Sequence, residues 1–120
     1  MSWKFDNSSP IYIQIMEQIK RMIARGELKP GDRVPAVRDM ALAAGVNPNT
    51  MQKALSELER AGILISNRTA GRFVADLNDN NINLKNDAGY KLTKSYVEGM
   101  RELGFNDGEL VDEVNKFING

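Results

Sequence analysis

The sequence contains no cysteine and no histidine. Without them the chain cannot form a disulfide, a thiol nucleophile or an imidazole base, and nearly all zinc-site chemistry is excluded. No apolar run approaches the roughly 18 residues that a membrane-spanning helix needs, and residues 1–5 lack the apolar core of a signal peptide. We therefore expect a soluble cytoplasmic protein that has no metal site and no cofactor and does not insert into a membrane.

The chain also lacks an excess of charge, because 16 Lys and Arg balance 16 Asp and Glu. The charges are unevenly distributed. Residues 1–76 hold eleven basic and eight acidic side chains, a net +3, whereas residues 77–120 hold five and eight, a net −3. The basic part therefore suits a polyanionic partner. With 42% hydrophobic and 27% charged residues, the composition is that of an ordinary globular protein.

Two helices joined by a turn are predicted near the N-terminus. Ser9 followed by Pro10 is typical of a capped helix start, and the apolar spacing that follows predicts a helix over residues 10–26. The Pro-Gly pair within residues 28–35 predicts a turn. Residues 36–44 then predict a short second helix, which a glycine closes.

A third helix is predicted over residues 48–60, with Asn47 as its cap and Pro48 at its first position. Its buried face consists of Met51, Ala54, Leu55 and Leu58. The β-prone runs 63–65 and 72–74 follow and predict a hairpin. Three short helices and a hairpin are the order of a winged helix-turn-helix domain, which we assign to residues 1–76. The expected fold class is mainly α with a small β-hairpin.

Residues 77–120 are predicted to form a linker and a helical hairpin. Residues 77–89 are rich in Asn, Asp and Gly and indicate the linker, and apolar spacing predicts helices over residues 88–104 and 107–119. The second helix starts with Asn106 and Glu109, an arrangement that resembles a capping box.

A segment of this size makes a poor independent core without a disulfide or a metal. We therefore expect it to dimerise with a second copy; the alternative is that both helices fold back on their own winged domain. The predicted dimerisation residues are Leu92, Tyr96, Met100, Leu103, Leu110, Val114, Phe117 and Ile118. Acidic side chains around the start of the last helix favour the helix dipole, which explains them better than a metal or acid–base site does.

The start of the third predicted helix is polar, and a helix-turn-helix places this part against DNA bases. The predicted DNA-facing residues there are Asn47, Asn49, Thr50, Gln52 and Lys53. Asn and Gln pair bidentately with adenine, and the free N–H groups of a helix start bind phosphate. The alternative is that Asn47 only caps the helix and that the others are solvated.

Basic residues and one glycine surround this helix and complete the predicted DNA-binding set. Arg38 lies near a helix start, where its charge opposes the dipole and requires an acidic neighbour or a phosphate. Arg33, Arg68 and Arg72 flank the turn and the hairpin, and Gly71 permits close approach of the chain. Simple solvation of these arginines is the alternative.

Several motifs occur in a fixed order over residues 10–75: P-I-Y-x-Q-I, then G-x-L-x-P-G-x-x-x-P, then R-x-x-A-x-x-x-x-V-N-P-N-T, and finally x-x-G-x-F-V. This region closely resembles the N-terminal DNA-binding domain of GntR-family bacterial transcription regulators. The resemblance implies a winged helix-turn-helix whose operator contacts fall on Arg38, on Asn47, Asn49 and Thr50, and on Gly71.

Two departures from the family pattern limit what the resemblance implies. Many members have a serine where this chain has Ala36, which removes a cap and a phosphate donor. Many also have an arginine in the middle of the recognition helix, where this chain has Gln52 and Lys53. The operator preference of arginine-bearing relatives is therefore not transferable.

The short C-terminal part and the V-N-P-N-T start resemble the YtrA-like branch of the family, whose members dimerise through a short helical segment and often act on transporter operons. The leading hypothesis is a homodimeric repressor that binds a palindromic double-stranded DNA operator. A winged-helix protein-interaction module without nucleic-acid binding is the alternative. An enzyme is not expected, because no convergent catalytic constellation is visible. The sequence carries no fingerprint for a small-molecule effector.

Overall fold

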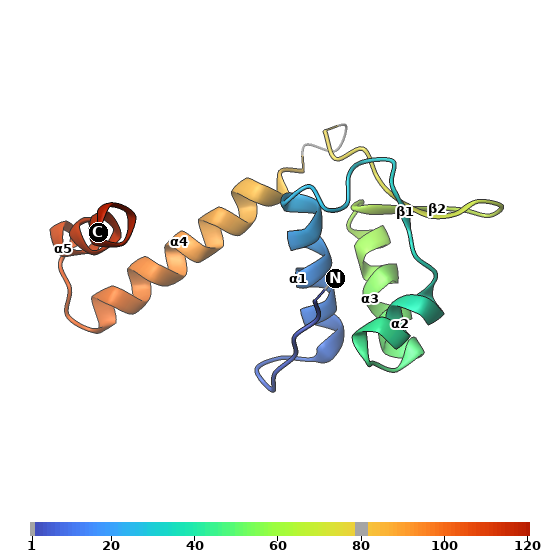
Figure 1. The fold of residues 1–120 in the computed structure, drawn as a ribbon, viewed down its shortest axis with the longest axis horizontal. Coiled ribbons are helices and arrows are strands. Elements are labelled where there is room, and N and C mark those ends of the chain that lie inside the picture. Colours follow the sequence, from blue (N-terminus) through green and yellow to red (C-terminus); the bar gives the residue numbers. More distant parts are fainter. Residues whose placement is uncertain (1, 79–81) are drawn as a thin grey trace. The chain divides into compact units, whose positions relative to one another are not determined.

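The computed structural model describes residues 2–78 and 82–120, and its chain divides into two compact units, one ending at Lys85 and the other beginning at Asn86. The elements in chain order are α1 (Ile11–Ala24), β1 (Arg33–Val34), α2 (Val37–Ala44), α3 (Pro48–Arg60), β2 (Leu64–Asn67), β3 (Gly71–Val74), α4 (Leu84–Glu102) and α5 (Asp107–Asn119) (Figure 1).

The core of the first unit lies where α1 and α2 pack against α3. The apolar spacing of each helix supplies one buried face, and the hairpin adds its base. The helical core residues include Ile15, Ile19, Met22, Met40, Ala41, Met51, Ala54, Leu55 and Leu58. Leu64 and Val74, which pair across β2 and β3, close the core from the sheet. The predicted buried face of the third helix, Met51, Ala54, Leu55 and Leu58, is thus confirmed.

The start of α1 differs from the prediction. Pro10, and not Ser9, is the N-cap residue, because its carbonyl oxygen accepts the first helical hydrogen bonds, from Ile13 N and Gln14 N at 3.1 and 3.3 Å. The Ser9 side chain makes no capping bond, and the Ser9 carbonyl instead accepts from Nε2 of Gln14 at 2.7 Å.

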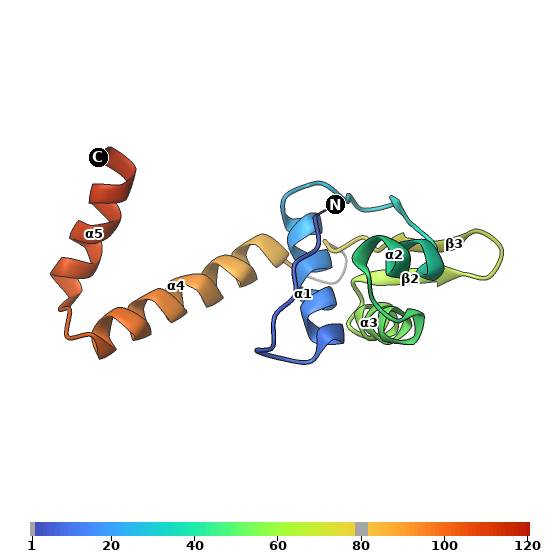
Figure 2. The same ribbon diagram turned by 60° about the horizontal axis from the view of Figure 1, so that its bottom comes forward.

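The predicted hairpin is part of a three-stranded antiparallel sheet with the order β1-β3-β2. Strand β1 pairs Arg33 with Phe73 and Val34 with Arg72, so the last part of the predicted 28–35 turn is a strand. A strand of two residues has no measurable alternation, which is why the sequence gives no sign of it. Figures 1 and 2 show that β2 and β3 extend beyond the helices, so the tip of the hairpin is free of them.

The segment before α1 is held to that helix by two glutamine side chains. The amide of Gln18 accepts from Lys4 N at 3.1 Å and donates to Lys4 O at 2.8 Å. The amide of Gln14 makes the same pair of bonds with Asp6, at 3.0 and 2.9 Å. In the same segment, the stacked rings of Trp3 and Phe5 pack against the core, so this segment is an integral part of the first unit.

Helix α4 begins at Leu84, four residues before the predicted start, so the predicted 77–89 linker is wrong in its second half. Leu77 is buried and Leu84 packs against the core of the first unit, whereas residues 79–81, in the middle of that prediction, lie outside the described residues. Asn, Asp and Lys at the helix start resemble a loop in composition, which explains the misassigned boundary.

Candidate nucleic-acid interface

The start of α3 presents polar side chains on a rigid helix. Asn47 caps the helix as predicted, since its Oδ1 accepts a hydrogen bond from Asn49 N at 2.7 Å. On the opposite face Met51, Ala54, Leu55 and Leu58 have no exposed surface, which fixes the rotation of the helix about its axis. Asn49, Gln52 and Lys53 are consequently exposed and Thr50 is half-buried.

These polar side chains differ in their existing contacts. Gln52 donates from Nε2 to Oγ of Ser56 at 2.9 Å, and the Lys53 ammonium lies 4.0 Å from the ring centroid of Tyr12 on α1. Within residues 2–78 and 82–120, the side chains of Asn49 and Thr50 have no hydrogen-bond partner. Asn49 and Thr50 can therefore bind a ligand without breaking a contact, whereas Lys53 first has to leave an aromatic ring.

Arg38 stands exposed in the first turn of α2. The N-cap residue of this helix is Ala36, which offers no side-chain cap, as the departure from the family pattern implies. Among the described parts of the chain, no acidic group forms an ion pair with Arg38, although Asp39 is its neighbour. The described residues thus provide no acidic partner for Arg38, which leaves a phosphate contact and simple solvation as the two alternatives.

The three predicted DNA-binding residues of the hairpin, Arg68, Gly71 and Arg72, have different environments. Arg68 is exposed in the turn, which Asn67 stabilises by accepting from the N and the Oγ1 of Thr69 at 3.0 Å. Arg72 is mostly buried and forms an ion pair with Glu59 of α3. The structure therefore brings Arg68 into the free tip, but directs Arg72 inward.

Gly71 has a left-handed backbone with φ of +102°, and a Cβ there would lie 3.3 Å from Nε of Arg33. The space that the missing side chain leaves is thus occupied by the Arg33 guanidinium, which reaches across the sheet from β1. The left-handed conformation favours glycine, and a Cβ at this position would in addition force the Arg33 side chain to shift.

The sequence did not indicate three residues that contact the predicted site or one another: Tyr12, Glu59 and Ser66. Ser66 of β2 donates its hydroxyl to the same Glu59 carboxylate oxygen that binds Arg72. Burial raises the pKa of Glu59, but the hydrogen bonds from Ser66 and Arg72 and the charge of Arg72 outweigh it, so this pKa lies below its usual value. No local pattern marks the three residues, because their partners are distant in sequence.

The second unit leaves most of its apolar side chains uncovered. Leu92, Leu103, Phe117 and Ile118 are strongly exposed, Phe117 at 89%, and Val114 is exposed at 41%. An open groove of ≈ 660 Å³ lies between α4 and α5. Its lining includes Leu92, Tyr96, Leu110 and Val114. Leu110 is already buried within a single chain, and Tyr96 and Met100 are half-buried.

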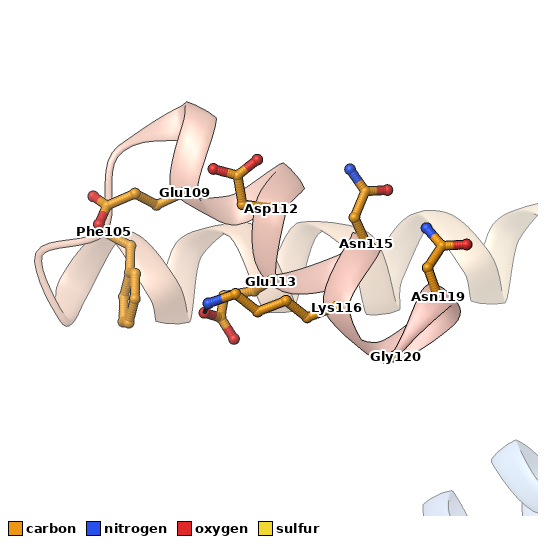
Figure 3. Close-up of a pocket in the computed structure, with 8 residues that line it drawn as sticks. All are labelled: Phe105, Glu109, Asp112, Glu113, Asn115, Lys116, Asn119 and Gly120. Carbon is orange, nitrogen blue, oxygen red and sulfur yellow. Dashed lines mark hydrogen bonds and ion pairs between the residues drawn. The ribbon is translucent and has the colours of Figure 1, made fainter.

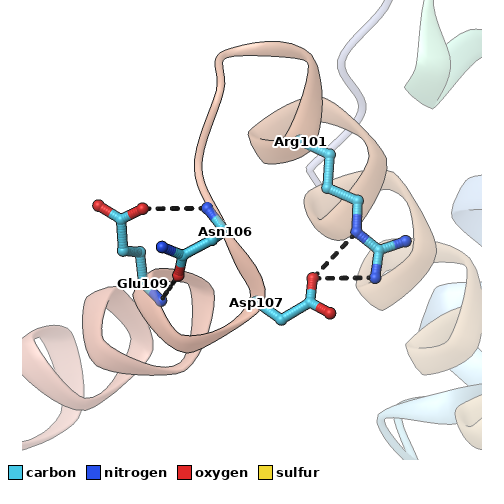
Figure 4. A network of polar contacts seen from close by, with 4 residues as sticks. All are labelled: Arg101, Asn106, Asp107 and Glu109. Carbon is cyan, nitrogen blue, oxygen red and sulfur yellow. Dashed lines mark hydrogen bonds and ion pairs between the residues drawn. The ribbon is translucent and has the colours of Figure 1, made fainter.

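Polar contacts fix the turn between α4 and α5. Asn106 and Glu109 form a reciprocal capping box at 3.0 and 2.9 Å, which confirms the predicted helix start, and Arg101 binds Asp107 through two nitrogens (Figure 4). Tyr96 also donates its hydroxyl to the Leu110 carbonyl at 2.8 Å. The two helices therefore form a defined hairpin.

Three acidic residues of α5, Glu109, Asp112 and Glu113, line a shallow hollow of ≈ 600 Å³ (Figure 3). Glu109 belongs to the capping box, and Glu113 pairs with Lys116 at 3.0 Å. The hydrogen bond to Glu113 and its charge raise the pKa of Lys116. Across the described residues, no group of three or more acidic side chains is arranged to hold a metal ion. Nor does any helix in these residues combine the length and apolar character needed to cross a membrane.

Comparison with known families gives a match over the whole winged region. The family model described as "Bacterial regulatory proteins, gntR family" matches residues 11–74. The chain is 39% identical over 120 residues to an uncharacterized HTH-type transcriptional regulator of Bacillus subtilis, YhcF, covering 100% of this chain and 99% of that one. It is 44% identical over 70 residues to the HTH-type transcriptional repressor YtrA of the same species, covering 58% of this chain and 54% of that one.

Solved structures agree with these sequence relationships. A GntR family transcriptional regulator from Listeria monocytogenes superposes with a TM-score of 0.85 at 35% identity, over 93% of this chain and 98% of that one. The AraR DNA-binding domain in complex with operator ORX1 superposes with a TM-score of 0.57 at 29% identity, over 62% of this chain and 96% of that one. The latter structure contains bound operator DNA.

Proposed function

Because the chain belongs to the gntR family of bacterial regulatory proteins and to its short YtrA-like branch, we propose that it is a homodimeric repressor that binds a palindromic operator. The protein is a winged helix-turn-helix transcription regulator. Our proposal also covers the residues that contact DNA, the homodimer, and repression as the mode of regulation. It places the protein in the cytoplasm and includes no catalytic role.

The arrangement at the start of α3 carries the proposal. The side chains of Asn49 and Thr50 are free to bind, the start of α3 carries the positive end of the helix dipole, and Arg38 lacks an ion-pair partner within the described residues. Short amide and hydroxyl groups read base edges in the major groove, while a helix end and an arginine bind phosphates. One face therefore carries both functions that sequence-specific DNA binding requires.

In this proposal residues 1–76 are the DNA-binding domain and residues 77–120 supply the linker and the dimer contact. Gln52 and Lys53 lie beside the base-reading residues of α3, and Arg68 and Gly71 approach the DNA backbone from the hairpin. A second copy of the protein covers the exposed apolar side chains of α4 and α5. A two-fold dimer presents two α3 helices, which suits a palindromic site. Patches of exposed apolar residues of this kind mark association surfaces in soluble proteins.

The names of two relatives support repression. YtrA and NagR of Bacillus subtilis are both described as repressors, and the AraR domain was solved with its operator bound. A winged helix that binds only protein is less well supported, since none of these observations favours it. Control of a transporter operon remains a prediction from the YtrA-like branch.

The direct test is selection of duplex DNA from a randomised pool by the full-length protein, followed by affinity measurements across a salt series. We expect enrichment of a palindromic sequence and an affinity that falls steeply as salt rises, because each phosphate contact releases counterions. Binding that is indifferent to both sequence and salt would contradict DNA recognition. A repression assay with the enriched sequence upstream of a reporter gene then separates repressor from activator.

A further inference from the structure

We propose that Glu59 is a positioning residue for DNA binding, which holds Arg72 and Ser66 and thereby fixes the β2–β3 hairpin against the recognition helix α3. In this arrangement Arg72 acts through Glu59 and is not itself a phosphate ligand. The proposal rests on the proposed function, because it concerns how the same DNA-binding face is assembled.

The sheet register places the two partners of Glu59 side by side. Ser66 of β2 and Arg72 of β3 are directly paired, two residues along from the pair Leu64 and Val74, whose side chains are buried in the core. Because side chains two residues apart in a strand share a face, the Ser66–Arg72 pair lies on the face that turns toward the core and α3. A single Glu59 carboxylate oxygen accepts hydrogen bonds from both.

This contact is the outermost polar link between α3 and the hairpin that the structure describes. Leu64 and Val74 attach the base of the hairpin, and the turn beyond Ser66 and Arg72 carries the exposed Arg68. Within the described residues, strand β1 supports β3 only at Phe73 and Arg72, so the hairpin is two-stranded beyond the Ser66–Arg72 pair, and isolated two-stranded hairpins are marginally stable. Glu59 thus determines the direction in which Arg68 is presented.

The burial of Arg72 argues against direct contact with phosphate. Its side chain is 17% exposed and that of Glu59 is 28% exposed, and the ion pair satisfies the charge of both. By contrast Arg33 and Arg68, which belong to the opposite face and the tip, form no ion pair in the described part of the chain. The basic residues of the sheet and its turn that are available to DNA are therefore Arg33 of β1 and Arg68 of the hairpin tip.

The two roles of Arg72 predict opposite effects of removing Glu59. If Arg72 is a DNA ligand, Glu59→Ala releases its guanidinium and deletes a negative charge near a polyanion, so the affinity for DNA rises. If Glu59 positions the hairpin, the same variant weakens binding despite the loss of a repulsive charge. The sign of the change separates the two.

The experiment uses the full-length protein and the fluorescein-labelled duplex that the wild-type protein selects from a randomised pool. We expect Glu59→Ala and Arg72→Ala each to bind roughly tenfold more weakly, as for loss of one specific contact, and the double variant to bind no more weakly than either. Hydroxyl-radical footprints should lose protection only where the hairpin lies and keep that of α3. Glu59→Gln, which retains an acceptor without the charge, should have an intermediate affinity.

Glu57→Ala is the matched control, because Glu57 also lies on α3 and pairs with a basic residue, Arg60, but that residue belongs to the same helix. It should bind DNA as tightly as the wild type. Circular dichroism and thermal melting of each variant check folding, and if Glu59→Ala is unfolded, Glu59→Gln decides the question alone.

Unchanged or tighter binding by a folded Glu59 variant, or additive losses in the double variant, would overturn the positioning role and restore Arg72 as a direct ligand. A wild-type protein that enriches no DNA sequence would contradict the proposed function itself, which is a different failure.

Discussion

Asn49 is exposed and Thr50 is half-buried at the start of α3, and neither side chain has a partner in the described residues, whereas Gln52 and Lys53 each have one. Unengaged groups on a rigid element bind with little reorganisation, so they contribute most to discrimination. The aromatic contact of Lys53 with Tyr12 is worth about 0.5–1 kcal/mol at an exposed site, which a phosphate has to exceed.

We therefore predict that Asn49→Ala weakens binding to the selected duplex by about 1–3 kcal/mol and relaxes preference at one base position of each half-site. Lys53→Ala should weaken binding to all sequences alike and reduce the salt dependence. Competition assays with duplexes substituted at single positions distinguish these outcomes. Equal losses on every duplex for Asn49→Ala would show that Asn49 contacts only the backbone.

Gly71 and Gly89 form a second contrast between single residues. We predict that Gly71→Ala destabilises the protein by about 1–3 kcal/mol, because alanine is strained at positive φ and its Cβ meets the Arg33 guanidinium. Gly89 lies inside α4 with open space around it, so Gly89→Ala should be neutral or stabilising. Urea unfolding of both variants measures the difference.

The carboxylate of Glu59 makes stability depend on pH in a defined direction. Its pKa is lower in the folded state than in the unfolded one, because the hydrogen bonds from Ser66 and Arg72 and the charge of Arg72 outweigh the effect of burial. The stabilisation it provides is complete above the unfolded pKa of about 4.3 and is lost as pH falls through the folded value. Wild type and Glu59→Gln should thus differ in unfolding free energy at pH 7, and the difference should shrink as the pH falls below the unfolded pKa. A constant difference would mean that ionisation of Glu59 contributes nothing.

Helices were the elements that sequence predicted best. Apolar spacing located α1, α2, α3 and α5, and the caps Asn47 and Asn106 marked two starts correctly, because capping is a local interaction. The winged fold and the predicted polar start of α3 also followed from the order of the motifs. Strand β1 and the early start of α4 were not predicted. The strand is too short to show an alternation of apolar and polar residues, and the helix start resembles a loop in composition.

Contacts between elements could not be predicted in the same way. Glu59 and Arg72 are 13 residues apart, and only the folding of the hairpin onto α3 brings them together. The sequence therefore predicted Arg72 as a basic residue near DNA and could not indicate that an acidic partner neutralises it.

Helix α2 lacks the side-chain cap that α3 and α5 possess, and a substitution at its N-cap residue can supply one. Ala36 has φ of −59° and ψ of 149°, the extended conformation of an N-cap residue. We predict that Ala36→Ser stabilises the protein by about 0.5–2 kcal/mol, as N-cap serines do. Ala43→Ser, at an exposed interior position of the same helix, should instead be slightly destabilising. Thermal unfolding of both variants tests the cap, and equal melting temperatures would contradict it.

The two units divide the work of the whole protein in our proposal, with DNA binding in the first and association in the second. Because the second unit exposes many apolar residues, a single substitution among them should measurably weaken the proposed dimer. Phe117, at 89% exposed in one chain, is the extreme case.

We predict that Phe117→Ser raises the dimer dissociation constant by at least tenfold, because the few large side chains that dominate an interface each contribute about 2 kcal/mol or more. Asn119→Ser, on the same helix, should leave association unchanged. Sedimentation over a concentration series measures both. A monomeric wild-type protein, or a Phe117→Ser protein that dimerises normally, would contradict the assigned role of the C-terminal helices.

The glutamine clamp on the first residues of the chain has a consequence for mutational tolerance. Gln14 and Gln18 bind the main-chain N–H and C=O groups of Asp6 and Lys4, so they recognise backbone and not side-chain identity. Position 4 should consequently accept almost any residue except proline, which has no N–H to donate. In a deep mutational scan, the sensitive positions would be the two glutamines, while the lysine that one of them holds would tolerate nearly every exchange.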